Sequence, residues 1–224
     1  MIQMGRSVYS LVLIDEIVEA VDKLAYEKNT SRSNLINQIL AKYFCFNTPE
    51  MRMREIFENV EQSMCNIDCF QIQFQPSSTM ISIRSALRYR YKPTIRYMLE
   101  LYRLCEPAMG ELRVTMRTQN STLIDILTSF FEFWSTLENK YIGSLFPDGN
   151  VFCSVEPGKY LRQFILPQNE NEQTNDIIAS AISNYIYFID SCLKLYFSKL
   201  DNLNEAAYFI ENKYCDYLKN NVII

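Results

Sequence analysis

The residues best suited to chemistry form a short polar cluster near the amino terminus. Three hydroxyl groups, an amide and a guanidinium occupy five consecutive positions: Thr30, Ser31, Arg32, Ser33 and Asn34. Hydroxyl and amide side chains of this kind cap the start of a helix, where free backbone N–H groups and the helix dipole attract anions. With an arginine beside them, these residues predict a helix start that binds phosphate.

Catalytic chemistry has little support in the composition. The chain has no histidine, which removes the commonest general base and metal ligand and with it Ser-His-Asp and Cys-His catalysis. There is no GxGxxG or P-loop pattern among its five glycines. The seven cysteines contain no CxxC pair. The closest two, Cys65 and Cys69, could hold a metal or form a redox couple, but reduced and buried thiols are the simpler interpretation. We therefore expect no enzyme activity, no metal and no cofactor.

Charge and hydropathy set further limits. The formal net charge is −4, so any surface for nucleic acid must be local rather than general. The chain is 48% hydrophobic, enough for a substantial core, yet it has no apolar run of the roughly 20 residues that span a bilayer. Its first residues lack the pattern of a signal peptide. The expectation is a cytoplasmic protein without membrane contact.

The first 45 residues predict a strand followed by two helices. Residues 8 to 13 alternate as in a short strand, with Tyr9, Leu11 and Leu13 on one side and Val8, Ser10 and Val12 on the other. Apolar residues then recur at helical spacing and form two apolar stripes. The first is Ile17, Val21, Leu24 and Ala25, and the second is Leu35, Ile36, Ile39, Leu40 and Tyr43. One short strand and two helices bury too little surface to fold alone, and an unpaired strand exposes its backbone groups. We expect pairing with a second chain.

Two segments, LIDEIVEAVDKLA at residues 13–25 and SRSNLI at residues 31–36, resemble the ribbon-helix-helix repressors of the Arc, MetJ and CopG type. The resemblance covers about a fifth of the chain. It implies a homodimer whose two strands pair antiparallel and enter the major groove of double-stranded DNA. It also implies that residues 30–34 contact the DNA phosphates.

The resemblance further implies that the outward side chains of the strand face the bases. In this chain they are Arg6, Val8, Ser10 and Val12. The family usually has Arg, Lys, Asn, Gln or Thr there, because base edges are read by hydrogen bonds, whereas valine can contact only thymine methyl groups. An alternative is that Val8 and Val12 are buried against the carboxy-terminal region or a partner, and that the module serves only for dimerisation.

Residues 48–224 predict a second, α+β domain after a ribbon-helix-helix domain at residues 1–47. A connecting helix at residues 51–64 is followed by strands at 70–74, 79–91 and 112–117, with a helix at 93–104. A long apolar helix at 122–141 is followed by a stretch at 143–176 that holds most of the remaining Gly and Pro and ends in the polar, acidic loop PQNENEQTND at 167–176. Two final helices at 177–200 and 204–219 complete the domain. The whole chain is thus predicted to be mainly α with a small antiparallel sheet. The final helices have a broad apolar stripe, which self-association, an unknown ligand or ordinary core packing could cover.

A basic segment runs through the predicted sheet. Between Arg84 and Arg117 there are eight Lys or Arg residues against three Glu. The candidates for a second nucleic-acid surface are Arg84, Arg88, Arg90, Lys92, Arg113 and Arg117. Either these residues form a solvated face paired with acids, or they bind phosphates of DNA or RNA.

These patterns favour a DNA-binding transcriptional regulator, a repressor, that acts as a homodimer or a higher oligomer. The carboxy-terminal domain would then oligomerise the chain or sense an effector. Two alternatives remain open. One is an interaction or assembly protein, such as a plasmid partition, relaxosome or antitoxin component, that binds a protein partner. The other is an RNA-binding protein that uses the basic face of the sheet.

Overall fold

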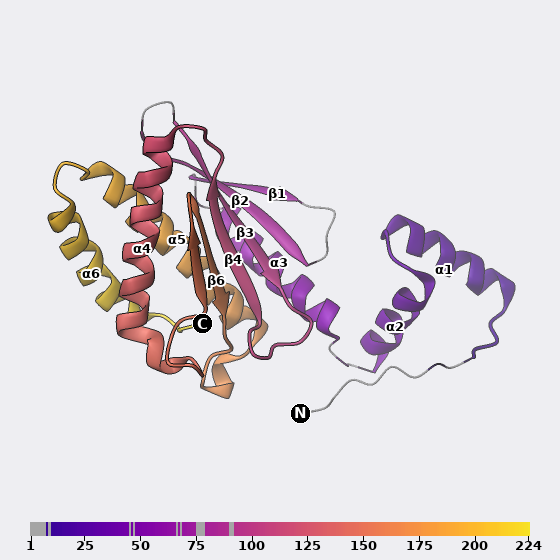
Figure 1. Cartoon of the computed structure of the whole chain (residues 1–224). Coiled ribbons are helices and arrows are strands. Elements are labelled where there is room, and N and C mark those ends of the chain that lie inside the picture. The colour runs from indigo at the N-terminus through magenta and orange to yellow at the C-terminus, as the bar shows by residue number, and fades with distance from the viewer. Residues whose placement is uncertain are drawn as a thin grey trace. The chain divides into compact units, whose positions relative to one another are not determined.

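The computed structural model describes residues 8, 10–44, 46, 48–65, 67, 69–74, 79–89 and 92–224 (Figure 1). The chain divides into two compact units, Met1–Met51 and Arg52–Ile224. The division falls in the first turn of helix α3 (Pro49–Cys65), whereas the sequence places the boundary between residues 47 and 48.

The amino-terminal unit contains two helices, α1 (Asp15–Glu27) and α2 (Arg32–Tyr43). Asp15 and Glu16 lie in the first turn of α1, where the helix dipole stabilises acidic side chains. The chain leaves α1 through Asn29, whose φ of 48° is in the left-handed region that Asn tolerates. The N–H of Thr30 then donates to the carbonyl of Ala25 at 2.9 Å, which closes the turn into α2.

The carboxy-terminal unit is built on a six-stranded sheet in the order β1-β2-β3-β4-β6-β5, and every neighbouring pair is antiparallel. The strands are β1 (Phe70–Phe74), β2 (Met80–Ala86), β3 (Thr94–Leu101), β4 (Gly110–Met116), β5 (Cys153–Glu156) and β6 (Lys159–Phe164). Strands β1 to β4 form a meander, and the β5–β6 hairpin joins it through β6. The chain is therefore α+β, with a larger sheet than the sequence predicts.

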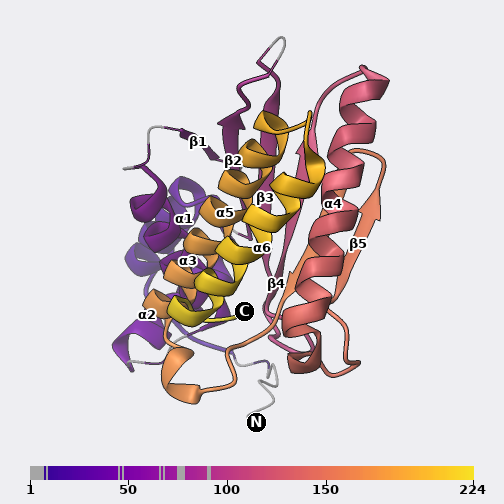
Figure 2. The same ribbon diagram turned by 90° about the vertical axis from the view of Figure 1, so that its left-hand side faces the viewer.

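Helices pack on one face of this sheet. Helices α4 (Ser121–Ile142) and α5 (Asn175–Ser198) lie against the strands, and α6 (Leu203–Asn220) lies outside them (Figure 2). Helix α3 contributes buried side chains to the same core and is tied to the start of α5, where Asn59 Nδ2 donates to Asp176 Oδ1 at 2.7 Å. Since α5 lies between the sheet and α6, ordinary core packing accounts for its broad apolar stripe.

The three long helices begin at polar caps that satisfy their first N–H groups. Asn120 caps α4, Thr174 caps α5 and Asn202 caps α6, each through a side-chain oxygen that accepts from a backbone N–H three residues later. The sequence predicts all three helices, with boundaries within a few residues of those observed. Within the part of the chain that the structure describes, no helix has the length and apolarity needed to cross a bilayer.

The predicted helix at residues 93–104 is wrong, since most of this segment is strand β3. Alternate residues Ile95, Tyr97 and Leu99 are fully buried, and the residues between them are partly exposed. This period of two is that of a strand with one covered face. Pro93 suits the start of a strand as well as the first turn of a helix.

Two further predictions need correction. The predicted strand at 79–91 ends at Ala86, and residues 87–89 lead into the connection to β3. The stretch at 143–176, for which the sequence predicts no strand, contains the β5–β6 hairpin. Its turn includes Gly158, whose φ of 68° favours glycine, and the N–H of Gly158 donates to Thr128 Oγ1 of α4 at 2.9 Å.

Candidate nucleic-acid interface

The start of α2 has the cap that the sequence predicts. Ser31 is the N-cap residue, and its Oγ accepts from the N–H of Asn34 at 3.2 Å. Asn34 Nδ2 donates to Thr30 Oγ1 at 2.9 Å, and this bond holds Thr30, the residue before the cap. Ser33 is exposed. Among the described residues, no acceptor is bound to the backbone N–H of Arg32 or Ser33, so these two groups can donate to an anion.

Arg32 forms an ion pair across the helix hairpin. Its Nε donates to Asp22 Oδ1 on α1 at 2.5 Å, and its Nη2 donates to the other carboxylate oxygen. The hydrogen bonds with Asp22 raise the pKa of Arg32, so the guanidinium stays protonated. Both side chains are about half exposed, and exposed pairs of this kind contribute about 0–1 kcal/mol. A phosphate can therefore compete with Asp22 for the guanidinium.

The predicted base-facing residues are open to solvent in the single chain. Val8 and Val12 are 100% and 101% exposed, and Ser10 is also exposed. Leu11, on the other side of the predicted strand, is exposed as well. Arg6 lies outside the described residues. Residues 10–14 belong to no helix or strand of the described chain, and because a ribbon needs two chains, the strand stays a prediction.

The two helices of this unit leave much apolar surface uncovered. Among the described residues of the hairpin, only Ala25, Leu35 and Ala41 are buried. The half-exposed side chains include three that lie on the predicted apolar stripes, Ile17, Ile39 and Leu40, at 45%, 47% and 44%. We call these three residues the hairpin apolar surface. Exposed apolar clusters on a folded unit mark interaction sites.

A second basic surface lies on the sheet face opposite the helices. Arg84 on β2 is directly opposite Arg96 on β3, and the row continues through Thr115 on β4 to Lys159 on β6. Within the described residues, no acidic side chain forms an ion pair with Arg84 or Arg96. Like charges directly opposite each other repel. This row is therefore suited to an external anion.

The other predicted basic residues lie around this row. Arg88 and Lys92 are exposed in the connection between β2 and β3, and Arg117 is exposed directly after β4. Arg113 shares the open face but pairs with Glu111 at 2.5 Å, so the interpretation as a solvated ion pair applies to this residue. Arg90 lies outside the described residues.

The sequence interpretation missed two members of the basic row, Arg96 and Lys159. Arg96 lies in a segment predicted as a helix and Lys159 in a stretch without a predicted strand, so the sequence prediction places neither on the sheet. Two signals could have found them. The alternation from Thr94 to Leu101 is that of a strand, and the Pro157-Gly158 pair before Lys159 is typical of a turn between strands.

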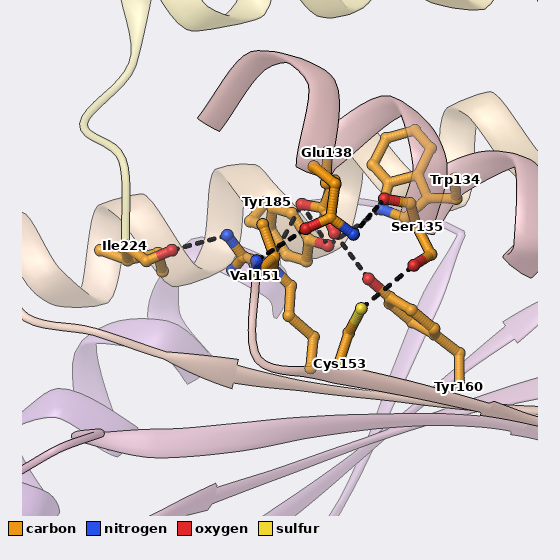
Figure 3. Close-up of polar contacts among 10 residues, drawn as sticks. Trp134, Ser135, Glu138, Val151, Cys153, Tyr160, Tyr185 and Ile224 are labelled. Carbon is orange, nitrogen blue, oxygen red and sulfur yellow. Dashed lines mark hydrogen bonds and ion pairs between the residues drawn. The ribbon is translucent and has the colours of Figure 1, made fainter. Parts of the chain in front are cut away.

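The carboxy-terminal unit also contains a buried polar network around Glu138 (Figure 3). Glu138 Oε2 accepts from the hydroxyl of Tyr160 at 2.6 Å, and Oε1 accepts from the hydroxyl of Tyr185 at 3.0 Å. Oε1 also lies 3.0 Å from Nε of Arg162. Arg162 Nη2 donates to the backbone oxygen of Ile224 at 2.7 Å. One carboxylate thus joins α4, α5, β6 and, through Arg162, the last described residue.

This network is enclosed. The side chains of Arg162 and Glu138 are 1% and 0% exposed, and the guanidinium lies 4.5 Å from the ring centre of Tyr185. Burial and the nearby Glu138 raise the pKa values of Tyr160 and Tyr185, so both hydroxyls stay protonated and donate. A group that acts on a substrate must reach it. We therefore assign the network a structural role and look to the exposed surfaces for function.

Comparison with protein-family models, with curated proteins and with solved structures finds no match. The proposed function therefore rests on the sequence pattern and the geometry of the chain.

Proposed function

We propose that the chain is a homodimeric DNA-binding regulator, a repressor of the ribbon-helix-helix class. The observation that carries the proposal is the exposure of the hairpin apolar surface together with that of Val8 and residues 10–13, which precede the hairpin. A second copy would cover both features, because its strand would pair with residues 8–13 and its helices would pack on Ile17, Ile39 and Leu40.

The apolar burial available from this contact favours dimerisation. Full burial of a Leu or Ile side chain contributes about 1.5–3 kcal/mol, so each half-exposed residue of the hairpin apolar surface contributes roughly half of that amount. A two-fold interface counts each residue twice. The contribution of the paired strand adds to this sum.

Dimerisation can be tested by sedimentation of the full chain. Ile39→Lys would place a charge in the interface and should weaken the association of the full chain. Asn37→Lys adds the same charge to the same helix at an exposed position outside the predicted stripe, and this variant should remain dimeric. Equal association of the Ile39→Lys and Asn37→Lys variants would contradict the proposed interface.

The DNA contact follows from the start of α2. Ser33 and the free N–H groups of Arg32 and Ser33 would bind a backbone phosphate, with the Arg32 guanidinium beside them. The outward residues Val8, Ser10 and Val12 would face the bases, where valine can contact thymine methyl groups. Such weak direct readout makes phosphate contacts a large part of the affinity, and binding should weaken steeply with salt.

A matched pair of variants separates DNA binding from stability. Arg32→Ala and Asp22→Asn both break the same ion pair, but only the first removes a positive charge. Binding to a duplex of the gene's own promoter region, measured at two salt concentrations, should fall with Arg32→Ala and hold or rise with Asp22→Asn. Equal losses in both variants would show that the ion pair matters only for the fold of the hairpin.

A second function, in a protein assembly, is favoured by the full exposure of Val8 and Val12 at positions where hydrogen-bonding residues are expected. In a partition, relaxosome or antitoxin component, these valines would bind a protein partner. The substitution Val12→Asn distinguishes the two functions. It adds a hydrogen-bonding side chain and should maintain DNA binding by a repressor, whereas it should weaken an apolar contact with a protein.

The basic row on the sheet favours RNA as a further alternative ligand. A phosphate backbone along Arg84 and Arg96 would supply the missing counter-charge. Changing Arg84 and Arg96 to Glu should abolish RNA binding if this surface is used, and should leave promoter binding by the amino-terminal unit intact.

A further inference from the structure

The two edges of the sheet differ in a way that points to a partner. Strand β5 has only four residues, Glu156 lies on it, and the next residue is Pro157. Short length, charge and proline are features that protect an edge from pairing. Strand β1, with the sequence FQIQF, has no charge and no proline over its five residues. It is the unprotected edge.

The backbone groups at this edge can be assigned from the register. Thr79 and Leu87 flank β2 and both bond toward β3. The carbonyl of Thr79 accepts from the N–H of Leu101, the last residue of β3, and the N–H of Leu87 donates to the carbonyl of Pro93, just before β3. Because bonding direction alternates along an antiparallel strand, the residues between them, Ser82 and Arg84, bond to β1. Their partners on β1 are Gln73 and Gln71.

It follows that Phe70, Ile72 and Phe74 direct their backbone N–H and carbonyl groups away from β2. The N–H of Phe70 donates to the carbonyl of Ile67 at 3.0 Å, which agrees with this assignment. The outward N–H groups of Ile72 and Phe74, and the carbonyl groups of Phe70, Ile72 and Phe74, face the free edge. They can form a ladder with another strand.

We propose that this edge pairs with β1 of a second copy, so that two sheets join into one of twelve strands about a two-fold axis at Ile72. The sequence FQIQF reads the same in both directions. An antiparallel pair centred on Ile72 therefore places Ile72 opposite Ile72, Gln71 opposite Gln73, and Phe70 opposite Phe74. The two Ile72 residues exchange two hydrogen bonds, and the N–H of each Phe74 donates to the carbonyl of the opposite Phe70.

The side chains beside the edge fit a second copy. Gln71 and Gln73 are exposed and form a close, non-hydrogen-bonded pair in this register, where amide groups can bond to each other across the axis. On the helix side, Tyr187 of α5 is 50% exposed and its ring centre lies 6.4 Å from that of Phe70. A strand added at the edge would lie next to this exposed ring.

The pairing concerns the carboxy-terminal unit and does not require the amino-terminal dimer. Where both form, the proposed amino-terminal dimer would raise the effective concentration of the second β1. The experiment must therefore detect β1 itself rather than the mass of the assembly alone.

Site-directed cross-linking tests the register directly. Two differently tagged full-length chains, one with Gln71→Cys and the other with Gln73→Cys, are co-expressed and oxidised. The opposing Cα atoms would be about 4.5 Å apart, within the range of a disulfide. We expect a reducible dimer of the two tagged chains, with the 71–73 linkage identified by mass spectrometry. Either variant alone should give much less product. In this register, position 71 of one chain is diagonal to position 71 of the other, and the same holds for position 73.

A charge exchange at the same exposed positions provides an independent test. In the register above, Gln71→Glu with Gln73→Glu places like charges opposite each other twice. Gln71→Glu with Gln73→Lys places opposite charges there instead. We expect the association constant of the second variant to exceed that of the first by about tenfold or more at low salt. Equal association of the two variants, or no 71–73 disulfide, would overturn the proposal.

Discussion

Removal of the carboxylate of Glu138 should destabilise the carboxy-terminal unit more than any surface change. In Glu138→Ala, Arg162 would keep its charge at 1% exposure without an acidic partner, and the hydroxyls of Tyr160 and Tyr185 would lose their acceptor. Breaking a buried ion pair on one side costs about 3–5 kcal/mol. For a unit of this size, 1 kcal/mol shifts the Tm by about 2–4 °C. The expected decrease in Tm is therefore roughly 6–20 °C.

The fluorescence of Trp134 provides the assay. It is the only tryptophan, it is fully buried, and its Nε1 donates to the Tyr185 hydroxyl at 3.1 Å. Its signal therefore reports on this unit and this network. The control is Glu156→Ala, which breaks a surface pair with Lys159 and should change the free energy of unfolding by less than about 1 kcal/mol. If Glu138→Ala behaved like the control, the network would not be desolvated as described, and the reasoning would fail.

Three further predictions concern stability. Burial raises the pKa of the Cys192 thiol from its ordinary 9.0 to about 12, so between pH 9 and 12 the unfolded chain loses this proton and the folded chain keeps it. The free energy of unfolding should therefore fall as the pH rises from 9 to 12. Cys192→Ala should make the denaturant midpoint fall less steeply with pH over this range. Gly110→Ala would place a Cβ 2.4 Å from the carbonyl oxygen of Glu100 and should cost about 1–3 kcal/mol in urea unfolding. Thr174→Ala removes the cap of α5 and should lower the free energy of unfolding by about 1 kcal/mol, whereas Thr174→Ser keeps a capping hydroxyl and should change it little.

The fold could be predicted from the sequence where the local signals all indicate the same element. The helices α4, α5 and α6 combine a cap with an apolar repeat of 3.6 residues, and all three predictions are confirmed. Strand β3 is not predicted because Pro93 is compatible with the first turn of a helix, and this signal competes with the alternation of Ile95, Tyr97 and Leu99. The β5–β6 hairpin is not predicted because its strands are short and its turn residues, Pro157 and Gly158, are also common in loops.

The candidate surfaces depended on tertiary structure that sequence spacing does not encode. Ser31 could be predicted as a cap because it contacts a residue three positions away. The pairing of Arg32 with Asp22 could not, since it depends on how α1 and α2 fold back on each other. The row from Arg84 to Lys159 crosses four strands and becomes visible only when their order and register are known.

The contrast between the two units has a consequence for regulation in the cell. Among the described residues of the hairpin, only Ala25, Leu35 and Ala41 are buried, whereas the carboxy-terminal unit has a dense core of its own. Under the proposed function, the amino-terminal unit would gain most of its stability from a second copy, so its active fraction would increase with the amount of protein synthesised. Expression level would then act as an input, and halving the gene dose would reduce promoter occupancy by more than half while the active dimer is scarce.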